Sequence, residues 1–131
     1  MAVAPFVGIV GYRRSRRNIL GMQARMVTVR DGVLRVVDKD DAQIEQVTLA
    51  GAAVELKRGM VQVVDGENAF FVYGLAGSNK VPRELTELAT RQEAEIAMGP
   101  SHDVPLLESL DAAQRSRALY DLLLQAGARE L

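Results

Sequence analysis

The fold is decided by residues 24–75, which read ARMVTVRDGVLRVVDKDDAQIEQVTLAGAAVELKRGMVQVVDGENAFFVYGL. Turn-forming pairs interrupt this stretch at near-regular intervals, among them Asp31-Gly32, Arg58-Gly59 and Asp65-Gly66. An Asp-Gly pair favours a two-residue hairpin, because a type I′ turn needs positive φ at both central positions. Short strands separated in this way are typical of an antiparallel barrel or sandwich and not of parallel βαβ units. We therefore predict an antiparallel meander.

Apolar residues alternate between these turns with the period of two that marks a half-buried strand. One irregularity is the spacing from Ile44 to Val47, which predicts a β-bulge near Glu45-Gln46. An earlier apolar run, Phe6 to Val10, predicts a first strand over residues 5–12. The remaining strands are expected near residues 24–30, 33–37, 43–49, 53–57, 60–64 and 69–75, which makes seven in all.

Two amphipathic segments follow the meander. Pro82 suits the first turn of a helix, and Gly99-Pro100 ends that helix. A second helix is expected within residues 105–127, with Gly127 as its C-terminal cap. The predicted fold class is mainly β with C-terminal helices (α+β): a seven-stranded antiparallel, partly open barrel closed by the first helix, plus an extra C-terminal helix. Residues 1–98 would form the barrel, and residues 99–131 a linker and helix, either within the same folding unit or as a partner-binding extension.

Composition excludes several classes of site. The chain has 131 residues, which suits one domain, and it has no cysteine, which rules out disulfides and thiolate metal sites. The single His102 excludes an all-histidine metal centre, and we predict no cofactor and no metal. No apolar run approaches the roughly 20 residues that a bilayer span requires. We expect a cytoplasmic protein, in the bulk or in peripheral contact with a membrane.

The order of seven short strands and then an amphipathic helix resembles a pleckstrin-homology-like domain of the small bacterial or GRAM type. The residues that carry the resemblance are Val27 to Val36, Ile44 to Leu49, and Phe70-Phe71-Val72 before the helix at Pro82. The resemblance covers about three-quarters of the chain and is one of pattern, without a diagnostic motif. The chain departs from the family in having no Trp and in lacking a Lys/Arg-x-Arg pattern on the second strand.

This resemblance implies a binding module without catalytic activity, and some members hold anionic lipid heads with a basic loop between the first two strands. In this chain that loop contains Arg13, Arg14, Arg16 and Arg17. Arginine forks bind phosphate or carboxylate groups through two parallel hydrogen bonds. Three interpretations stay open for the cluster: a solvated loop, which is the usual fate of a charge run, an anion site, and, least favoured, a nucleic-acid contact.

Other motifs favour structural roles. Gly8 to Gly11 spells GxxG, but its inner residues are apolar, so we expect the glycines to serve backbone approach. Ser101-His102-Asp103 has the residue types of a catalytic triad as sequence neighbours, which do not converge as a triad requires. Asp38, Asp40 and Asp41 lack EF-hand spacing and fit a hairpin turn better than a calcium site.

The leading hypothesis is a non-catalytic binding or assembly module. It would contact a protein partner through the C-terminal helix, with Leu119, Leu122 and Leu123 at the interface, and an anionic ligand through the arginine loop. The same leucines could instead pack on the chain's own sheet. The first alternative is an oligomeric structural subunit. The second is a small enzyme without a recognisable motif that uses carboxylates such as Asp38, Asp65 or Glu67.

Overall fold

The computed structural model of the chain describes residues 5–14, 23–75, 81–95 and 112–131. Seven strands follow one another in the order expected from the sequence. They are β1 (Phe6–Arg13), β2 (Gln23–Arg30), β3 (Val33–Val37), β4 (Gln43–Thr48), β5 (Ala53–Lys57), β6 (Met60–Asp65) and β7 (Asn68–Tyr73), with a short 3-10 turn, η1 (Leu49–Gly51), between β4 and β5. Helices α1 (Arg83–Glu95) and α3 (Ala112–Gln125) and a two-residue strand, β8 (Arg129–Glu130), complete the described elements.

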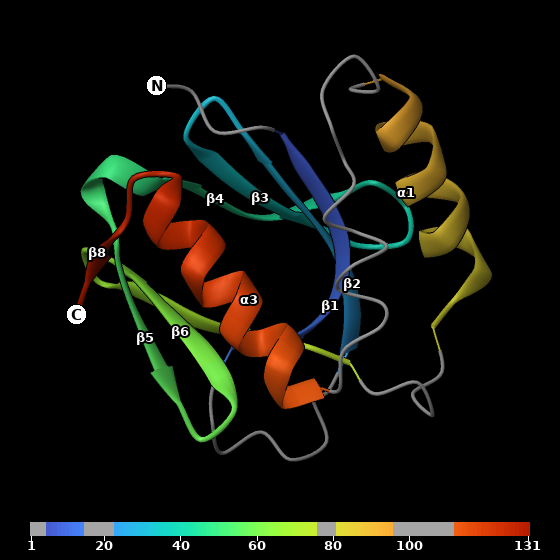
Figure 1. The fold of residues 1–131 in the computed structure, drawn as a ribbon. Helices are drawn as coiled ribbons and strands as arrows, with labels where there is room; N and C mark the ends of the chain where they lie inside the picture. The colour runs from blue at the N-terminus through green and yellow to red at the C-terminus, as the bar shows by residue number, and fades with distance from the viewer. Residues whose placement is uncertain (1–4, 15–22, 76–80, 96–111) are drawn as a thin grey trace.

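The strands form one sheet in the order β4-β3-β2-β1-β7-β6-β5-β8. Every neighbouring pair is antiparallel except β5 and β8, which run parallel. Strand β1 lies at the centre, because it pairs with β2 along most of its length and with β7 at its last residues. The sheet curls so that β2 to β4 and β5 to β7 enclose a shared interior (Figure 1). This arrangement confirms the predicted antiparallel meander and the predicted mainly β class with C-terminal helices.

The hairpin turns have the geometry that their sequences predict. Both central residues of the β2–β3 turn have positive φ, 53° at Asp31 and 75° at Gly32, and Arg58 and Gly59 repeat the pattern at 53° and 76°. The predicted bulge is also present, displaced by one residue. Val36 pairs with Glu45 and Val37 with Gln43, so the extra residue on β4 is Ile44.

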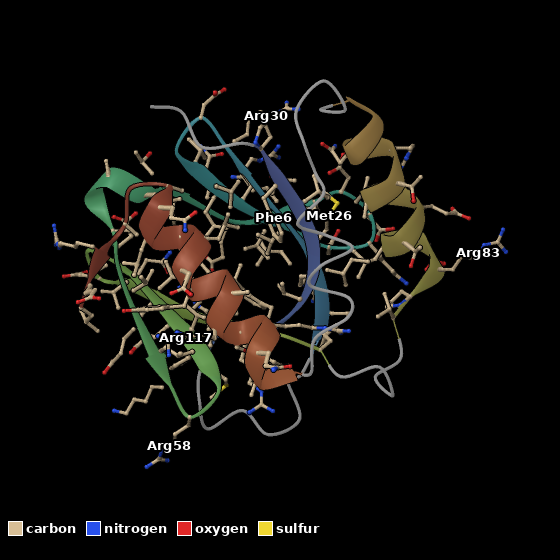
Figure 2. The ribbon with its side chains drawn as sticks, in the orientation of Figure 1. Phe6, Met26, Arg30, Arg58, Arg83 and Arg117 are labelled. Carbon is tan, nitrogen blue, oxygen red and sulfur yellow. The ribbon has the colours of Figure 1, made fainter. Side chains whose placement is uncertain are left out.

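The sheet separates two apolar clusters. The larger cluster fills the barrel with inward side chains from β1 to β7, and it includes Phe6 and Phe70. The smaller cluster lies on the outer face, where Val7 and Met26 pack against Leu85 of α1. Figure 2 shows Phe6 and Met26 on the two sides of the β1–β2 pair, the first toward α3 and the second toward α1.

The two helices exchange the roles that the sequence suggested. We expected the helix after Pro82 to close the barrel and the last helix to be extra. Instead, α3 inserts Leu119 and Leu123 into the barrel interior, with 2% and 0% of their surface exposed, whereas α1 covers the outside of β1 and β2. The correction has a simple cause: both helices carry an apolar stripe, and a stripe does not reveal which side of a sheet it will cover.

Helix α3 ends as the sequence predicted. The N–H of Gly127 donates to the carbonyl of Leu124 and the N–H of Ala128 to that of Leu123, the hydrogen-bond pair of a Schellman motif. Gly127 has a φ of 123°, which favours glycine. The turn sends the chain directly into β8 along the edge of β5. No helix among the described residues is long and apolar enough to cross a bilayer.

Candidate functional site at the end of strand β1

The arginine cluster begins at the end of β1, and its first two members have different surroundings. Arg13 is the last residue of β1 and pairs with Phe71 of β7, and Arg14 follows it. Alternation along β1 directs residues 6, 8, 10 and 12 into the barrel and residues 7, 9, 11 and 13 to the outer face. Arg16 and Arg17, also predicted as anion-binding residues, lie outside the described residues.

Arg14 is paired with a carboxylate inside the barrel mouth. Its Nη1 lies 2.6 Å from Oε2 of Glu45 and 2.5 Å from Oδ1 of Asn68. The hydroxyl of Tyr12 donates to the same Glu45 oxygen at 2.6 Å, and the Asn68 amide donates to the other at 3.1 Å. Glu45 is only 7% exposed, so this network joins β1, β4 and β7 around one buried carboxylate.

The charges of this network explain its titration. Burial raises the pKa of Tyr12 to about 12, and the hydrogen bond to the Glu45 carboxylate adds to the effect. The negative charge of Glu45 raises the pKa of Arg14. A buried carboxylate is tolerated when it is paired and fully hydrogen-bonded. Arg14 therefore supplies the counter-charge of the buried Glu45, while 59% of its own side chain remains exposed.

Arg13 pairs with no carboxylate among the described residues and lies instead over an aromatic ring. Its guanidinium carbon is 5.5 Å from the ring centroid of Tyr73, within the range of a cation–π contact. The ring approaches β1 closely because position 11 is glycine: a Cβ there would lie 2.1 Å from Cε2 of Tyr73. Gly8 has the matching role on the inner face, where a Cβ would lie 2.6 Å from Cζ of Phe6. The two glycines of the GxxG motif therefore leave space for two aromatic rings, Phe6 on the inner face of β1 and Tyr73 on the outer face.

Among the described residues, two donors at this outer position have no hydrogen-bond acceptor. Nε of Arg13 and the hydroxyl of Tyr73 are both buried without a hydrogen-bond partner in the described part of the chain. The whole Tyr73 side chain is buried as well, with 8% of its surface exposed. A buried donor left unsatisfied costs about 1–3 kcal/mol. Arg13 itself is half-buried, so part of the side chain reaches the surface.

The remaining predicted site residues are distributed as follows. Leu119 and Leu123 are core residues of the barrel, and Leu122 is half-buried against the same core, so packing on the chain's own sheet accounts for this stripe. The Asp38 carboxylate accepts hydrogen bonds from the N–H groups of Asp40 and Ala42, as a turn residue does. Among the described residues, no three acidic or histidine side chains gather as metal ligands. The Ser101-His102-Asp103 motif lies outside the described residues.

Glu45 is the site residue that sequence analysis missed. The available signal was its parity with Val47 on β4, because residues two apart in a strand face the same side. A carboxylate that faces the same side of the sheet as a buried valine is expected to be buried, and it then needs hydrogen-bond or charge partners. Those partners, Tyr12 and Asn68, are 33 and 23 residues away in the sequence, so no local pattern could identify them.

Comparison with known proteins adds one likeness. No protein-family model and no curated protein matches the chain. Among solved structures, the chain is similar to the C-terminal PH domain of pleckstrin, crystallised in complex with D-myo-Ins(1,2,3,4,5)P5. The two are 16% identical with a TM-score of 0.41, over 70% of this chain and 93% of that chain. A likeness at this level assigns no ligand and no residue roles.

Proposed function

We propose that this chain is a non-catalytic binding module that holds an anionic group at the outer end of β1, with Arg13 as the binding residue. The observation that carries the proposal is the contrast between two adjacent arginines. Arg14 is paired with the buried Glu45 carboxylate, whereas Arg13 lies over the Tyr73 ring and forms no ion pair with a described residue. A stacked guanidinium is held in one orientation, and it loses less conformational freedom when it binds a ligand.

The ligand chemistry follows from the donors. The guanidinium offers a planar set of N–H groups that matches the oxygens of a phosphate or a carboxylate. The unpartnered Tyr73 hydroxyl adds a neutral donor beside it. Arg16 and Arg17 follow in the sequence and contribute further positive charge to this segment. A phosphate group is the best fit, supplied either by a lipid head at a membrane surface or by a soluble phosphorylated molecule.

The non-catalytic part of the proposal is supported by the state of Glu45. A general acid or base must have access to the proton that it transfers. Both Glu45 oxygens instead accept hydrogen bonds from side chains of the same chain. Its role is to fasten β4 to β1 and β7.

The test is co-flotation of the protein with phosphatidylcholine vesicles that contain or lack a phosphatidylinositol phosphate. We expect the protein to bind the phosphorylated vesicles and Arg13→Gln to weaken binding about tenfold, the loss of one charge-assisted contact. Arg30→Gln, which removes an exposed charge at the other end of β2, is the matched control and should bind as the parent does.

Titration with soluble inositol phosphate distinguishes the two ligand sources. Binding in both assays indicates recognition of the phosphate group itself, and binding to vesicles alone indicates that the membrane surface contributes. Equal binding by the Arg13→Gln and Arg30→Gln proteins would refute the Arg13 site, and so would no binding of the parent protein in either assay.

A further inference from the structure

The Glu45 carboxylate lies within a set of donors that other parts of the chain supply. The Tyr12 hydroxyl and Nη1 of Arg14 donate to its Oε2, each at 2.6 Å, and Nδ2 of Asn68 donates to its Oε1 at 3.1 Å. Strand β4 contributes only the carboxylate, whereas the donors come from β1, from the residue that follows it and from β7. Side-chain donors that converge on one carboxylate, a guanidinium among them, have the composition of an anion-binding site.

Contacts that do not involve Glu45 hold these donors in position. Nη1 of Arg14 also donates to Oδ1 of Asn68 at 2.5 Å, and this bond turns the amide nitrogen of Asn68 toward the carboxylate. Tyr12 is 8% exposed, and its ring centroid lies 5.8 Å from that of Phe70 in the barrel core. We expect the donors to stay in place when the carboxylate is removed, because the pairing of β1 with β7 positions them.

The donor set is buried at one end and open to solvent at the other. The Arg14 side chain is 59% exposed, whereas the Glu45 side chain that it contacts is 7% exposed. Burial strengthens a charge-assisted hydrogen bond, and the exposed Arg14 gives a small anion a way to reach the donors. A carboxylate already bound to these donors excludes a second anion, both because it fills the space and because like charges repel.

We propose that the barrel mouth contains a binding site for a carboxylate, and that Glu45 is its internal occupant. Removal of the Glu45 side chain beyond Cβ should create a cavity that binds a free carboxylate from solution. Acetate is the matched probe, because its methyl carbon and carboxylate correspond to the Cγ and the carboxylate that Glu45→Ala removes. In the parent protein the internal carboxylate keeps this site closed to external anions.

This inference does not depend on the proposed Arg13 site. Tyr12 faces the barrel interior, whereas Arg13 lies over the Tyr73 ring on the outer face of β1. Occupation of the inner site by the chain's own carboxylate also gives a reason for placing the proposed external site on the outer face. A failure of acetate binding would leave the Arg13 proposal standing, and a failure of vesicle binding would leave the inner site standing.

The experiment is urea unfolding of Glu45→Ala in sodium acetate and in sodium chloride of equal ionic strength, at neutral pH. A ligand that binds only the folded state raises the folding equilibrium constant by the factor 1 + [L]/Kd. We expect about a tenfold gain at about 100 mM acetate, which corresponds to a Kd of about 10 mM. The parent protein should show no gain, because Glu45 already fills the site.

Further variants separate binding at this site from a general effect of acetate. Glu45→Gln fills the same space with a neutral amide and should gain nothing from acetate. Glu67→Ala removes an exposed carboxylate from a turn and is the matched control, also without a gain. Addition of Arg14→Gln to Glu45→Ala should abolish the acetate effect, because the charged donor is lost.

A second variant keeps the test decisive if Glu45→Ala does not fold in chloride. Glu45→Ser retains a hydroxyl that can accept from one of the donors, and it should show the same acetate dependence. Absence of an acetate-specific gain in both Glu45→Ala and Glu45→Ser would overturn the site. An equal gain in the parent protein, or in the double variant with Arg14→Gln, would overturn it as well.

Discussion

The two faces of β1 use the same kinds of residue for different purposes. The inner face has Gly8 beneath the Phe6 ring, Arg14 at the barrel mouth on Glu45, and α3 as its covering helix. The outer face has Gly11 beneath the Tyr73 ring, Arg13 stacked on that ring, and α1 as its covering helix. On the inner face every named polar group is paired, whereas on the outer face two buried donors have no partner within the part of the chain that the structure describes.

This difference separates residues that serve the fold from the residue to which we assign the proposed anion site. The inner face is enclosed, and its charge is balanced within the chain, so its residues serve the fold. The outer face has a smaller apolar cluster and an arginine that pairs with no described carboxylate, which is why we propose the anion site there. Neighbouring residues of a single strand thus have separate roles because a strand directs them to opposite sides.

The largest predicted effect compares the two helices. Leu123→Ala should destabilise the protein by about 3–5 kcal/mol, because the cavity would lie in the enclosed barrel core. Leu85→Ala, at an equally buried position of α1, should cost about 2–3 kcal/mol, because the smaller outer cluster can collapse around the gap. Urea unfolding followed by circular dichroism measures both. An equal or larger loss at Leu85 would contradict the ranking of the two faces.

The second prediction concerns the buried carboxylate. Glu45→Ala removes the acceptor of Tyr12 and Asn68 and the counter-charge of Arg14, and we expect a loss of about 2–3 kcal/mol in the free energy of unfolding. Glu67→Ala, at an exposed turn position, is the control and should change stability by less than about 0.5 kcal/mol. Similar values for the two variants would show that the network does not hold the barrel mouth together.

The third prediction tests whether Gly8 and Gly11 are needed to leave space for the Phe6 and Tyr73 rings. Gly11→Ala should cost about 1–3 kcal/mol, and Gly8→Ala slightly less, because the added methyl overlaps the Tyr73 ring more deeply than the Phe6 ring. In a Tyr73→Ala background the cost of Gly11→Ala should nearly vanish, which a double-mutant cycle of unfolding free energies measures. An undiminished cost in that background would mean that contact with Tyr73 is not the reason for glycine.

The smallest predicted effect is alkaline destabilisation from the inner face. The pKa of Tyr12 rises from its ordinary 10 to about 12 on folding, so the folded state favours the neutral hydroxyl. The contribution of the Tyr12 hydroxyl to the free energy of unfolding is complete below pH 10 and is lost as the pH rises toward 12. The expected change is roughly 1–2 kcal/mol after allowance for solvent screening. Urea midpoints across this range should fall more steeply for the parent than for Tyr12→Phe. Parallel curves would exclude Tyr12 as the source.

Much of the fold was predictable because its signals are local. Asp31-Gly32 and Arg58-Gly59 specify turns with positive φ, and alternation between them specifies strands. Gly127 specifies the end of α3 in the same way. The bulge on β4 was detectable from broken alternation but was placed one residue late, since the register also depends on the pairing with β3.

The candidate site was predictable only in outline. The arginine cluster is visible in the sequence, but nothing local distinguishes Arg13 from Arg14. The distinction arises because Arg14 reaches Glu45, 31 residues away, whereas Arg13 meets a ring brought by β7.

By itself, the sequence determined the seven strands, their turns and the two helices, because each depends on the conformational preferences of a few adjacent residues. Only the tertiary structure decided which helix fills the barrel, which arginine is neutralised and why Gly8 and Gly11 are glycines. Those outcomes depend on contacts between segments far apart in the chain. The sequence shows that an apolar helix stripe must be buried and that an arginine can pair with an acid or a ring. The folded sheet determines which surface the stripe covers and which group the arginine contacts.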